Sequence, residues 1–392
     1  MRIVIAPQEF KGSLTASEAA AAMAVGAREA LPAASLELAP MSDGGPGTVE
    51  AVVAASGGRT VATTVQDPIG RPVAAEWGTV GEDTAVIEMA AAAGLLRMAG
   101  DERGPRAAST YGVGELVRAA LDAGCRRLIV GQGGSATNDG GAGMAQALGV
   151  RFLDTDGGEL PPGGAALACL ERIDSSALDP RLARCEVVAA TDVMNPLCGP
   201  EGASLVYGPQ KGASPEVARE LDAALRRYGE VVERDVGVRV LDVPGAGAAG
   251  GLGAGLITFL GARIEPGVEI VAEVVRLRER VRGADPSTAL RADLVLTGEG
   301  RLDGQTGYGK TVAGVARIAA AEGVPVIVVA GTLGEGWERI LESGVEGVEL
   351  IVPRLGTLEE AMERPAEMLA AATAWAVNGW LRLRSVTGKR DG

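Results

Sequence analysis

Histidine is absent from the 392 residues of this chain. The absence excludes Ser-His-Asp and Cys-His catalysis, histidine-ligated zinc and an imidazole general base. Proton transfer in any catalytic mechanism must therefore fall to a carboxylate, a lysine, a tyrosine or a metal-bound water. The four cysteines form no Cys-x-x-Cys pair, so we expect them to be reduced and buried.

Lysine is nearly absent too. The 37 basic residues are 33 arginines and 4 lysines. Three of the lysines, Lys11, Lys211 and Lys310, lie in glycine-flanked polar segments, and the fourth is Lys389. Because arginine serves almost everywhere else, the pattern indicates that a compact ammonium is needed at these three positions. Chance placement is the alternative.

Long hydrophobic runs are missing as well. No apolar run reaches the roughly 18 residues that span a bilayer, and the apolar start over residues 2–6 is too short for a signal-peptide core. We therefore expect a cytoplasmic protein with no membrane partner. The net charge of −14 argues against a nucleic-acid partner, and it requires an anionic substrate to be captured by local positive charge.

The chain does contain the alternation that is typical of α/β proteins, and its length favours two domains. Strand and helix patterns alternate early and late in the chain, with a capping box over Thr15–Glu18, whereas β-branched runs over 59–89 predict an antiparallel meander. The predicted fold class is α/β with two domains. A discontinuous parallel-sheet domain covers 1–58 and 286–392, and an inserted mixed α/β domain with the glycine-rich loops covers 59–285.

The segment around which the chain is organised runs from Gly131 to Gly143. An apolar run over 127–130 precedes it and predicts a buried strand, and residues 144–148 predict the opening of a helix. The backbone N–H groups of such a turn, together with a helix N-terminus, can close on a phosphate. Close packing of strand and helix is the alternative.

Two other glycine-rich segments match known motifs. Gly304–Thr311 fits the Walker A pattern, but residues 298–303 separate it from its strand, so we interpret the match as coincidence. We still expect Lys310 to lie near a phosphate. Gly245–Gly250 fits the dinucleotide pattern G-x-G-x-x-G, but Pro244 interrupts the strand that this pattern requires. Close packing is favoured there over nicotinamide binding, and a phosphate role stays open.

Acidic residues cluster in the same kind of loop, at or just past predicted strand ends: Asp43, Asp139, Asp192, Glu299 and Asp303. Carboxylate oxygens suit Mg2+, and an aspartate can orient or deprotonate an attacking hydroxyl. Each acid taken alone could also be an ordinary turn former. Glycine-rich turns, isolated lysines and carboxylates without imidazole together indicate phosphoryl transfer, which needs positioning and charge neutralisation.

These motifs together resemble the glycerate kinase type-1 family. They follow the family's order over nearly the whole chain: Phe10-Lys11-Gly12-Ser13-Leu14, Asp43-Gly44-Gly45, Gly133 to Gly141, Asp192 with Asn195-Pro196-Leu197, Gly208 to Ala213, Pro244 to Gly251, and Thr297 to Arg301 with Asp303, Gln305 and Lys310.

The resemblance implies ATP-dependent phosphorylation of D-glycerate at the 2-hydroxyl, giving 2-phosphoglycerate. It also implies two α/β domains, one flavodoxin-like and one resembling restriction endonucleases, with the site between them. A kinase that forms 3-phosphoglycerate, a kinase of another small hydroxy acid, a module that senses nucleotide without transferring phosphate, and a nicotinamide dehydrogenase built on Gly245–Gly250 remain alternatives. A homodimer is left open.

The resemblance also implies roles for single residues, each named here by its predicted contact. ATP and its phosphates would contact Gly133, Gly134, Ser135, Thr137, Asn138, Glu299 and Lys310. Glycerate would contact Lys11, Lys211 and Asn195. Mg2+ would be bound by Asp192 and Asp43, and catalysis would depend on Lys11, Asp192, Asp43 and Asp303. The chain departs from the family at two places, with Gln8-Glu9 in place of Asp-Ser and Pro46 in place of Glu.

Overall fold

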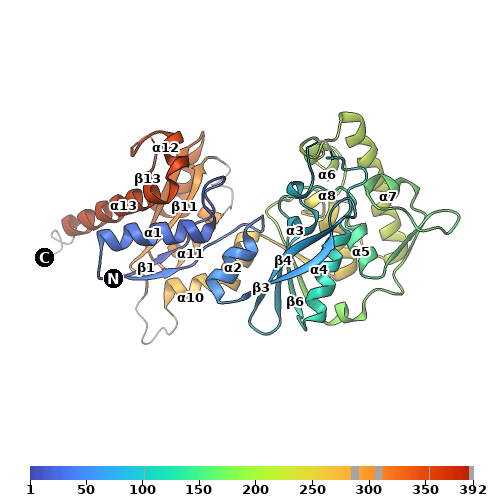
Figure 1. The fold of residues 1–392 in the computed structure, drawn as a ribbon, viewed down its shortest axis with the longest axis horizontal. Helices are drawn as coiled ribbons and strands as arrows, with labels where there is room; N and C mark the ends of the chain where they lie inside the picture. The colour runs from blue at the N-terminus through green and yellow to red at the C-terminus, as the bar shows by residue number, and fades with distance from the viewer. Residues whose placement is uncertain (101, 284–290, 305–310, 353, 388–392) are drawn as a thin grey trace. The chain divides into compact units, whose positions relative to one another are not determined.

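The computed structural model describes residues 1–100, 102–283, 291–304, 311–352 and 354–387. These residues gather into two compact units, each with its own large β-sheet (Figure 1). The first unit holds 1–43, 50–57 and the described part of 268–392, and the second holds 44–49 and 58–267. The domain limits expected from the sequence stay a prediction; they place residues 268–285 with the inserted segment.

The first unit is built on a five-stranded parallel sheet. In sheet order its strands are β13 (Val345–Leu350), β12 (Val326–Leu333), β11 (Leu294–Leu302), β1 (Arg2–Ile5) and β2 (Ser35–Leu38). Counted along the chain, this is the 2-1-3-4-5 order of flavodoxin-like sheets, in which ligands bind at the carboxyl ends where the order reverses, here between β1 and β11. The predicted parallel sheet, interrupted in sequence, is confirmed.

Helices cover both faces of this sheet (Figure 1). The helices of this unit are α1 (Ala16–Ala30), α2 (Thr48–Ser56), α9 (Gly267–Val274), α10 (Leu277–Arg282), α11 (Thr311–Ala321), α12 (Leu358–Glu363), α13 (Pro365–Thr387) and the 3-10 helix η6 (Trp337–Ser343). The predicted capping box is present, because the Thr15 hydroxyl accepts from the Glu18 N–H at 3.2 Å and the Glu18 carboxylate accepts from the Thr15 N–H at 2.9 Å. Helices α1 and α13 pack closely at Gly26, where a Cβ would lie 1.9 Å from the Ala370 carbonyl oxygen.

The second unit is built on a six-stranded mixed sheet. In sheet order its strands are β10 (Arg263–Glu265), β9 (Glu186–Ala190), β6 (Arg127–Gly131), β5 (Thr84–Glu88), β4 (Pro72–Val80) and β3 (Arg59–Gln66). Strands β3, β4 and β5 form the predicted antiparallel meander, while β5, β6, β9 and β10 run parallel. The α/β fold class is therefore confirmed, and the predicted likeness of this unit to restriction endonucleases stays a prediction.

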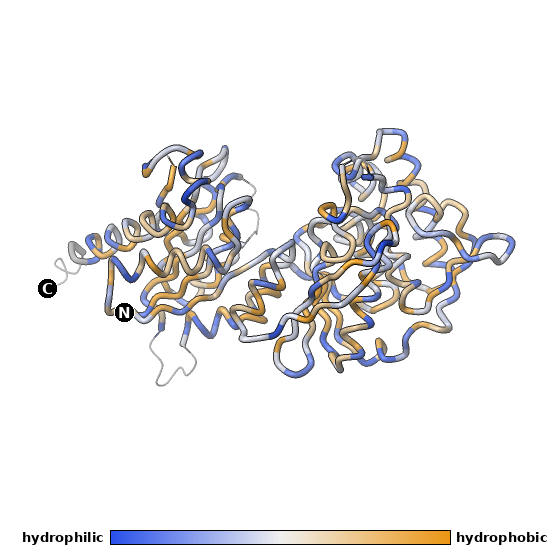
Figure 2. Tube along the Cα trace, in the orientation of Figure 1, coloured by the Kyte–Doolittle hydropathy of each residue, from blue (hydrophilic) through white to orange (hydrophobic). Residues whose placement is uncertain are grey.

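Helices and a small hairpin complete the second unit: α3 (Met89–Ala93), α4 (Tyr111–Asp122), α5 (Ala142–Ala147), α6 (Ala203–Tyr207), α7 (Pro215–Val236), α8 (Ala248–Leu260), β7 (Arg151–Leu153) paired with β8 (Arg172–Asp174), and the 3-10 helices η1 (Leu95–Arg97), η2 (Gly164–Cys169), η3 (Pro180–Arg184) and η4 (Pro209–Lys211). Apolar residues follow the strands and the inner helix faces in both units (Figure 2). In the described part of the chain, no helix is long and apolar enough to cross a membrane.

All four cysteines are free thiols, as the sequence predicts. Cys125 and Cys198 are buried and Cys185 is half-buried, but Cys169 is exposed. The expectation of burial is wrong for Cys169, because this residue ends the short η2 helix, only part of which packs inward.

Candidate active site

The glycine-rich turn joins β6 to α5, so the predicted strand, turn and helix are present. Helix α5 spans only six residues, and the N–H groups of Gly141 and Gly143 already donate to the Asp139 carboxylate, both at 3.2 Å. The N-terminus of α5 is therefore occupied by a carboxylate of the chain itself. We expected this terminus to bind a phosphate, and that part of the expectation is wrong.

The tip of the turn is the part that reaches solvent. Gly133 is half-buried and Gly134 is exposed, whereas Ser135 is buried and both Thr137 and Asn138 are fully buried. Asn138 directs its amide inward and donates from Nδ2 to the Ser204 hydroxyl at 2.8 Å. An anion approaching from solvent would meet the backbone of Gly133 and Gly134, and the predicted nucleotide contacts of Thr137 and Asn138 stay predictions.

Asp139 and Lys211 lie on the buried side of the turn. Asp139 Oδ2 accepts from the N–H and the hydroxyl of Thr110, at 2.8 and 2.9 Å, and burial raises the pKa of this carboxyl. Lys211 Nζ donates to the Thr137 carbonyl oxygen at 2.7 Å. Burial lowers the pKa of Lys211 to about 7, and the nearby Asp139 opposes that shift. Lys211 was predicted to bind glycerate, but its ammonium is directed to the turn.

A short segment that directly follows Asp43 packs against the exposed tip. The Gly133 N–H donates to the Gly44 carbonyl at 3.4 Å, and a Cβ on Gly133 would lie 2.5 Å from the Gly45 Cα. This approach of two backbones requires residues without side chains. The Pro46 ring reaches within 3.1 Å of the position a Cβ on Gly134 would take, so the family departure at Pro46 lies at the tip of the turn.

Asp192 lies at the same edge of the sheet as the glycine-rich turn. Strands β6 and β9 are parallel neighbours with Gly131 paired to Ala190, and Asp192 follows Ala190 by two residues. The Asp192 side chain is exposed, and its Oδ1 accepts from the Gly267 N–H at 3.0 Å. The structure therefore brings this predicted metal ligand close to the predicted phosphate turn.

Asn195, predicted to bind glycerate, uses both ends of its amide within the second unit. Its Nδ2 donates to the Glu201 carbonyl at 2.8 Å, and its Oδ1 accepts from the Tyr207 hydroxyl at 2.8 Å. A contact between Asn195 and substrate stays a prediction, because it would require one of these bonds to be exchanged.

The other predicted residues belong to the first unit. Lys11 is exposed and follows β1, Asp43 is half-buried and follows β2, Glu299 lies within β11, and Asp303 comes directly after it. These positions are at the carboxyl ends of the strands, on both sides of the point where the sheet order reverses. Lys310 and Gln305 lie outside the described residues.

Glu9, one of the two residues at which the chain departs from the family pattern beyond β1, joins this group. Its carboxyl is half-buried, and burial raises its pKa; Lys11 opposes the shift and Asp43 adds to it. Glu9, Lys11 and Asp43 are therefore close enough to interact electrostatically. The signal in the sequence was the charged residue itself, directly beyond the first strand.

The dinucleotide-like segment serves packing. Ala249, Gly250 and Gly251 have left-handed backbones with φ of 53, 72 and 91°. A Cβ on Gly250 would lie 2.0 Å from the Thr137 carbonyl oxygen, and the Gly250 carbonyl accepts from the Gly140 N–H at 3.0 Å. The glycines of this motif thus let two turns approach each other, which favours the packing interpretation over nicotinamide binding.

Among the described residues, no group of three or more acidic or cysteine side chains could hold a metal alone. Mg2+ commonly takes one or two carboxylates and completes its shell with water and substrate phosphates. The oxygen donors of Asp192 and Asp43 suit that ion chemically.

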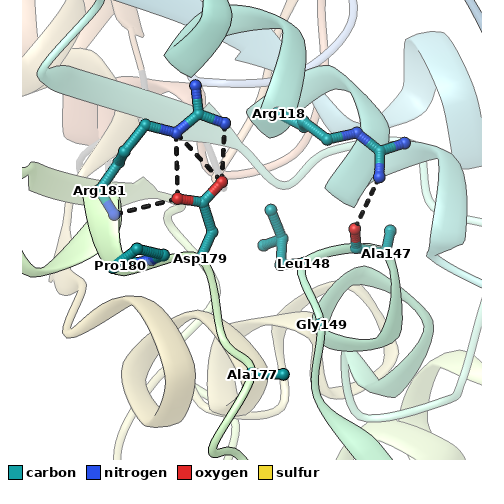
Figure 3. Close-up of a pocket in the computed structure, with 8 residues that line it drawn as sticks. All are labelled: Arg118, Ala147, Leu148, Gly149, Ala177, Asp179, Pro180 and Arg181. Atoms are coloured by element: carbon teal, nitrogen blue, oxygen red, sulfur yellow. Dashed lines mark hydrogen bonds and ion pairs between the residues drawn. The ribbon is translucent and has the colours of Figure 1, made fainter.

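One open cavity of about 460 Å3 lies elsewhere in the second unit (Figure 3). It is lined by Arg118, Ala147, Leu148, Gly149, Ala177, Asp179, Pro180 and Arg181. Arg181 is paired with Asp179 and with Asp122, each at 2.7 Å, and Arg118 donates to the Ala147 carbonyl at 3.1 Å. Both guanidinium groups are engaged within the protein, and none of the predicted site residues lines this cavity.

The fold is that of an α/β protein, and the candidate site residues follow parallel strands, at the sheet edge where α/β proteins bind ligands. A family model described as the glycerate kinase family matches residues 3–381. The chain belongs to the glycerate kinase family. It is accordingly an enzyme, a phosphotransferase with an alcohol group as acceptor, as its motifs predict.

Individual relatives match over nearly their full length. The chain is 48% identical over 381 residues to a glycerate kinase of Halalkalibacterium halodurans, covering 96% of this chain and 98% of that one. It is 46% identical over 374 residues to a glycerate 2-kinase of Escherichia coli, covering 95% and 96%. A crystal structure of a protein assigned as glycerate kinase 2 from Salmonella typhimurium superposes with a TM-score of 0.87 at 45% identity, covering 98% of this chain and 99% of that one.

Proposed function

We propose that this enzyme transfers the γ-phosphoryl group of ATP to the 2-hydroxyl of D-glycerate, giving 2-phosphoglycerate and ADP. The observation that carries the choice of hydroxyl is the identity of 46% to a relative named glycerate 2-kinase. The half-buried Gly133 and the exposed Gly134, at the same sheet edge as Asp192, support a phosphate site.

In the proposed reaction the 2-hydroxyl oxygen bonds to the γ-phosphorus while the bond to the β–γ bridging oxygen breaks. The backbone N–H of Gly134, at the exposed tip of the turn, binds a phosphate oxygen, with Gly133, Ser135, Glu299 and Lys310 also in the nucleotide site. Lys11 neutralises the glycerate carboxylate or the charge on the transferring phosphoryl group. Asn195 orients glycerate after exchanging one of its internal hydrogen bonds.

Two roles are proposed for the carboxylates, and Asp43 and Asp192 are candidates for both. Asp192 and Asp43 hold Mg2+, which when bound supplies positive charge to the phosphate oxygens. The proton of the 2-hydroxyl passes to a carboxylate among Asp43, Asp192 and Asp303 and from there to water. Localisation in the cytoplasm and a homodimer stay predictions from the sequence.

The test is to incubate the protein with MgATP and D-glycerate and to identify the product by phosphorus and proton NMR. Signals of 2-phosphoglycerate and ADP are expected. Formation of 3-phosphoglycerate would overturn the choice of hydroxyl, and phosphorylation of another hydroxy acid alone would overturn the substrate. ATP binding with no transfer would leave a nucleotide-sensing module, whereas appearance of reduced nicotinamide with NAD and a hydroxy acid would favour a dehydrogenase.

A further inference from the structure

Lys211 is among the largest fully buried side chains in the described part of the chain, with 1% of its surface exposed. Burial of an ammonium is rare, because the charge loses its water unless the protein replaces it. Here the replacement is specific: Nζ donates to the Thr137 carbonyl oxygen at 2.7 Å across 74 residues of sequence. Lys211 thus connects the η4 segment to the glycine-rich turn.

The neighbouring residues hold the same turn from the same buried side. Asn138 Nδ2 donates to the hydroxyl of Ser204, which lies on α6, just before the η4 segment that carries Lys211. Two successive turn residues, 137 and 138, are therefore tied to the segment 204–211. Asp139, the next residue, accepts hydrogen bonds from Thr110, Gly141 and Gly143.

The buried side of the turn holds two ionisable side chains of opposite sign. Asp139 interacts electrostatically with Lys211, and both side chains are fully buried. Removing one member of such a pair leaves the other charge buried without a partner. The folded protein then loses more stability than when both members are removed. The shape of the turn therefore depends on the pair, while the exposed Gly133–Gly134 tip makes no bond to either side chain.

We infer that Lys211 is a positioning residue for the nucleotide site, holding the Thr137 carbonyl from the buried side and so setting the conformation of the turn whose Gly133–Gly134 backbone binds the phosphates of ATP. This inference rests on the proposed function. It replaces the predicted contact between Lys211 and glycerate, because a side chain bonded inward at 1% exposure has no surface to offer a substrate.

The experiment compares Lys211→Met, which keeps the length and apolar stem of the side chain, with Lys11→Met, the same chemical change at an exposed lysine. ATP affinity is measured by calorimetry, and KM for ATP and for D-glycerate is measured separately. Lys211→Met is expected to weaken ATP binding at least about tenfold, because losing a hydrogen bond from a charged group lowers affinity by about this factor. The KM for glycerate is expected to stay within about twofold of the wild-type value. Lys11→Met is expected to affect glycerate use and turnover instead.

Three outcomes would overturn the inference. An unchanged ATP affinity with a raised KM for glycerate would make Lys211 a direct substrate ligand. A lowered melting temperature with both constants unchanged would make it a purely structural residue. If Lys211→Met fails to fold, the double variant Lys211→Met/Asp139→Asn, which removes both buried charges, is measured in the same way. Loss of the fold in that variant too would show that Lys211 supports the whole unit.

The wild-type reaction separates this inference from the function on which it rests. If wild-type protein forms no phosphoglycerate from MgATP and D-glycerate, the proposed function fails whatever the variants do. If wild-type protein forms 2-phosphoglycerate and Lys211→Met binds ATP normally, the function stands and only the positioning role of Lys211 is refuted.

Discussion

Asp139 accepts two hydrogen bonds from Thr110, one from its N–H at 2.8 Å and one from its hydroxyl at 2.9 Å. The same carboxylate accepts from Gly141 and Gly143, and the Thr110 hydroxyl in turn accepts from the Met144 N–H at 2.9 Å. One buried acid thereby joins the start of α4 to the turn and to the start of α5. Asp139, one of the five acids at strand ends, therefore helps to hold the fold together.

Replacing this acid should cost stability. Asp139→Ala leaves three backbone N–H groups unpaired in the interior, so we expect the free energy of unfolding to fall by about 3–5 kcal/mol. Urea unfolding measures the change. Asp154→Ala is the matched control, because Asp154 accepts from the N–H groups of Asp156 and Gly158 in an exposed turn, and it should lose about 1 kcal/mol. Equal losses in the two variants would contradict a special role for burial.

The stability of the protein should also depend on pH through Lys211. Burial lowers its pKa to about 7, against an ordinary value of 10.5, and Asp139, which also interacts with Tyr228, opposes this shift. Between these two values the unfolded chain holds the proton and the folded chain releases it, so stability contributed by this group rises with pH. The free energy of unfolding of wild type relative to Lys211→Met should therefore increase from pH 7 to pH 9. A difference that does not vary with pH would refute this assignment.

Lys11 is expected to act on the substrate side of the reaction. Lys11→Ala should lower turnover at least about a hundredfold, the scale for loss of a charge partner in the transition state, with no loss of fold because the side chain is exposed. Steady-state kinetics with MgATP and D-glycerate measures the turnover, and a circular dichroism spectrum checks the fold. Turnover near the wild-type value would remove Lys11 from the catalytic residues.

Asp192 offers a substitution that separates charge from hydrogen bonding. Its Oδ1 accepts from the Gly267 N–H, and the amide oxygen of Asp192→Asn can accept the same bond. The variant should keep this hydrogen bond yet lose at least about a hundredfold in turnover and require more Mg2+, because the negative charge is gone. Titration of activity with Mg2+ decides the point. A normal Mg2+ dependence would show that Asp192 does not bind the metal.

Gln132 is buried, and neither polar atom of its amide has a hydrogen-bond partner among the described residues. Replacing an unpaired buried amide by an apolar group of similar shape is neutral or stabilising, so Gln132→Met should keep or raise the stability by up to about 1 kcal/mol. Asn138→Leu is the contrasting variant, since it removes the bond to Ser204 and should destabilise. A large stability loss in Gln132→Met would reveal a partner for the amide.

Local sequence determined much of this protein. The capping box at Thr15, the meander over residues 59–88 and the strand, turn and helix around Gly131 all form where the pattern predicts, because neighbours in the chain make these bonds. The family, and with it the kinase class, also followed from motifs read in order along the chain.

The tertiary structure alone decided which polar residues face solvent. Thr137, Asn138 and Lys211 are residue types that often bind ligands, yet all three are buried. Asp139 occupies the N-terminus of α5, where a phosphate was expected to bind. The physical reason is distance along the chain. The partner of Thr137 comes from 74 residues away and that of Asp139 from 29, and burial depends on which distant segments pack there rather than on the residues of the turn.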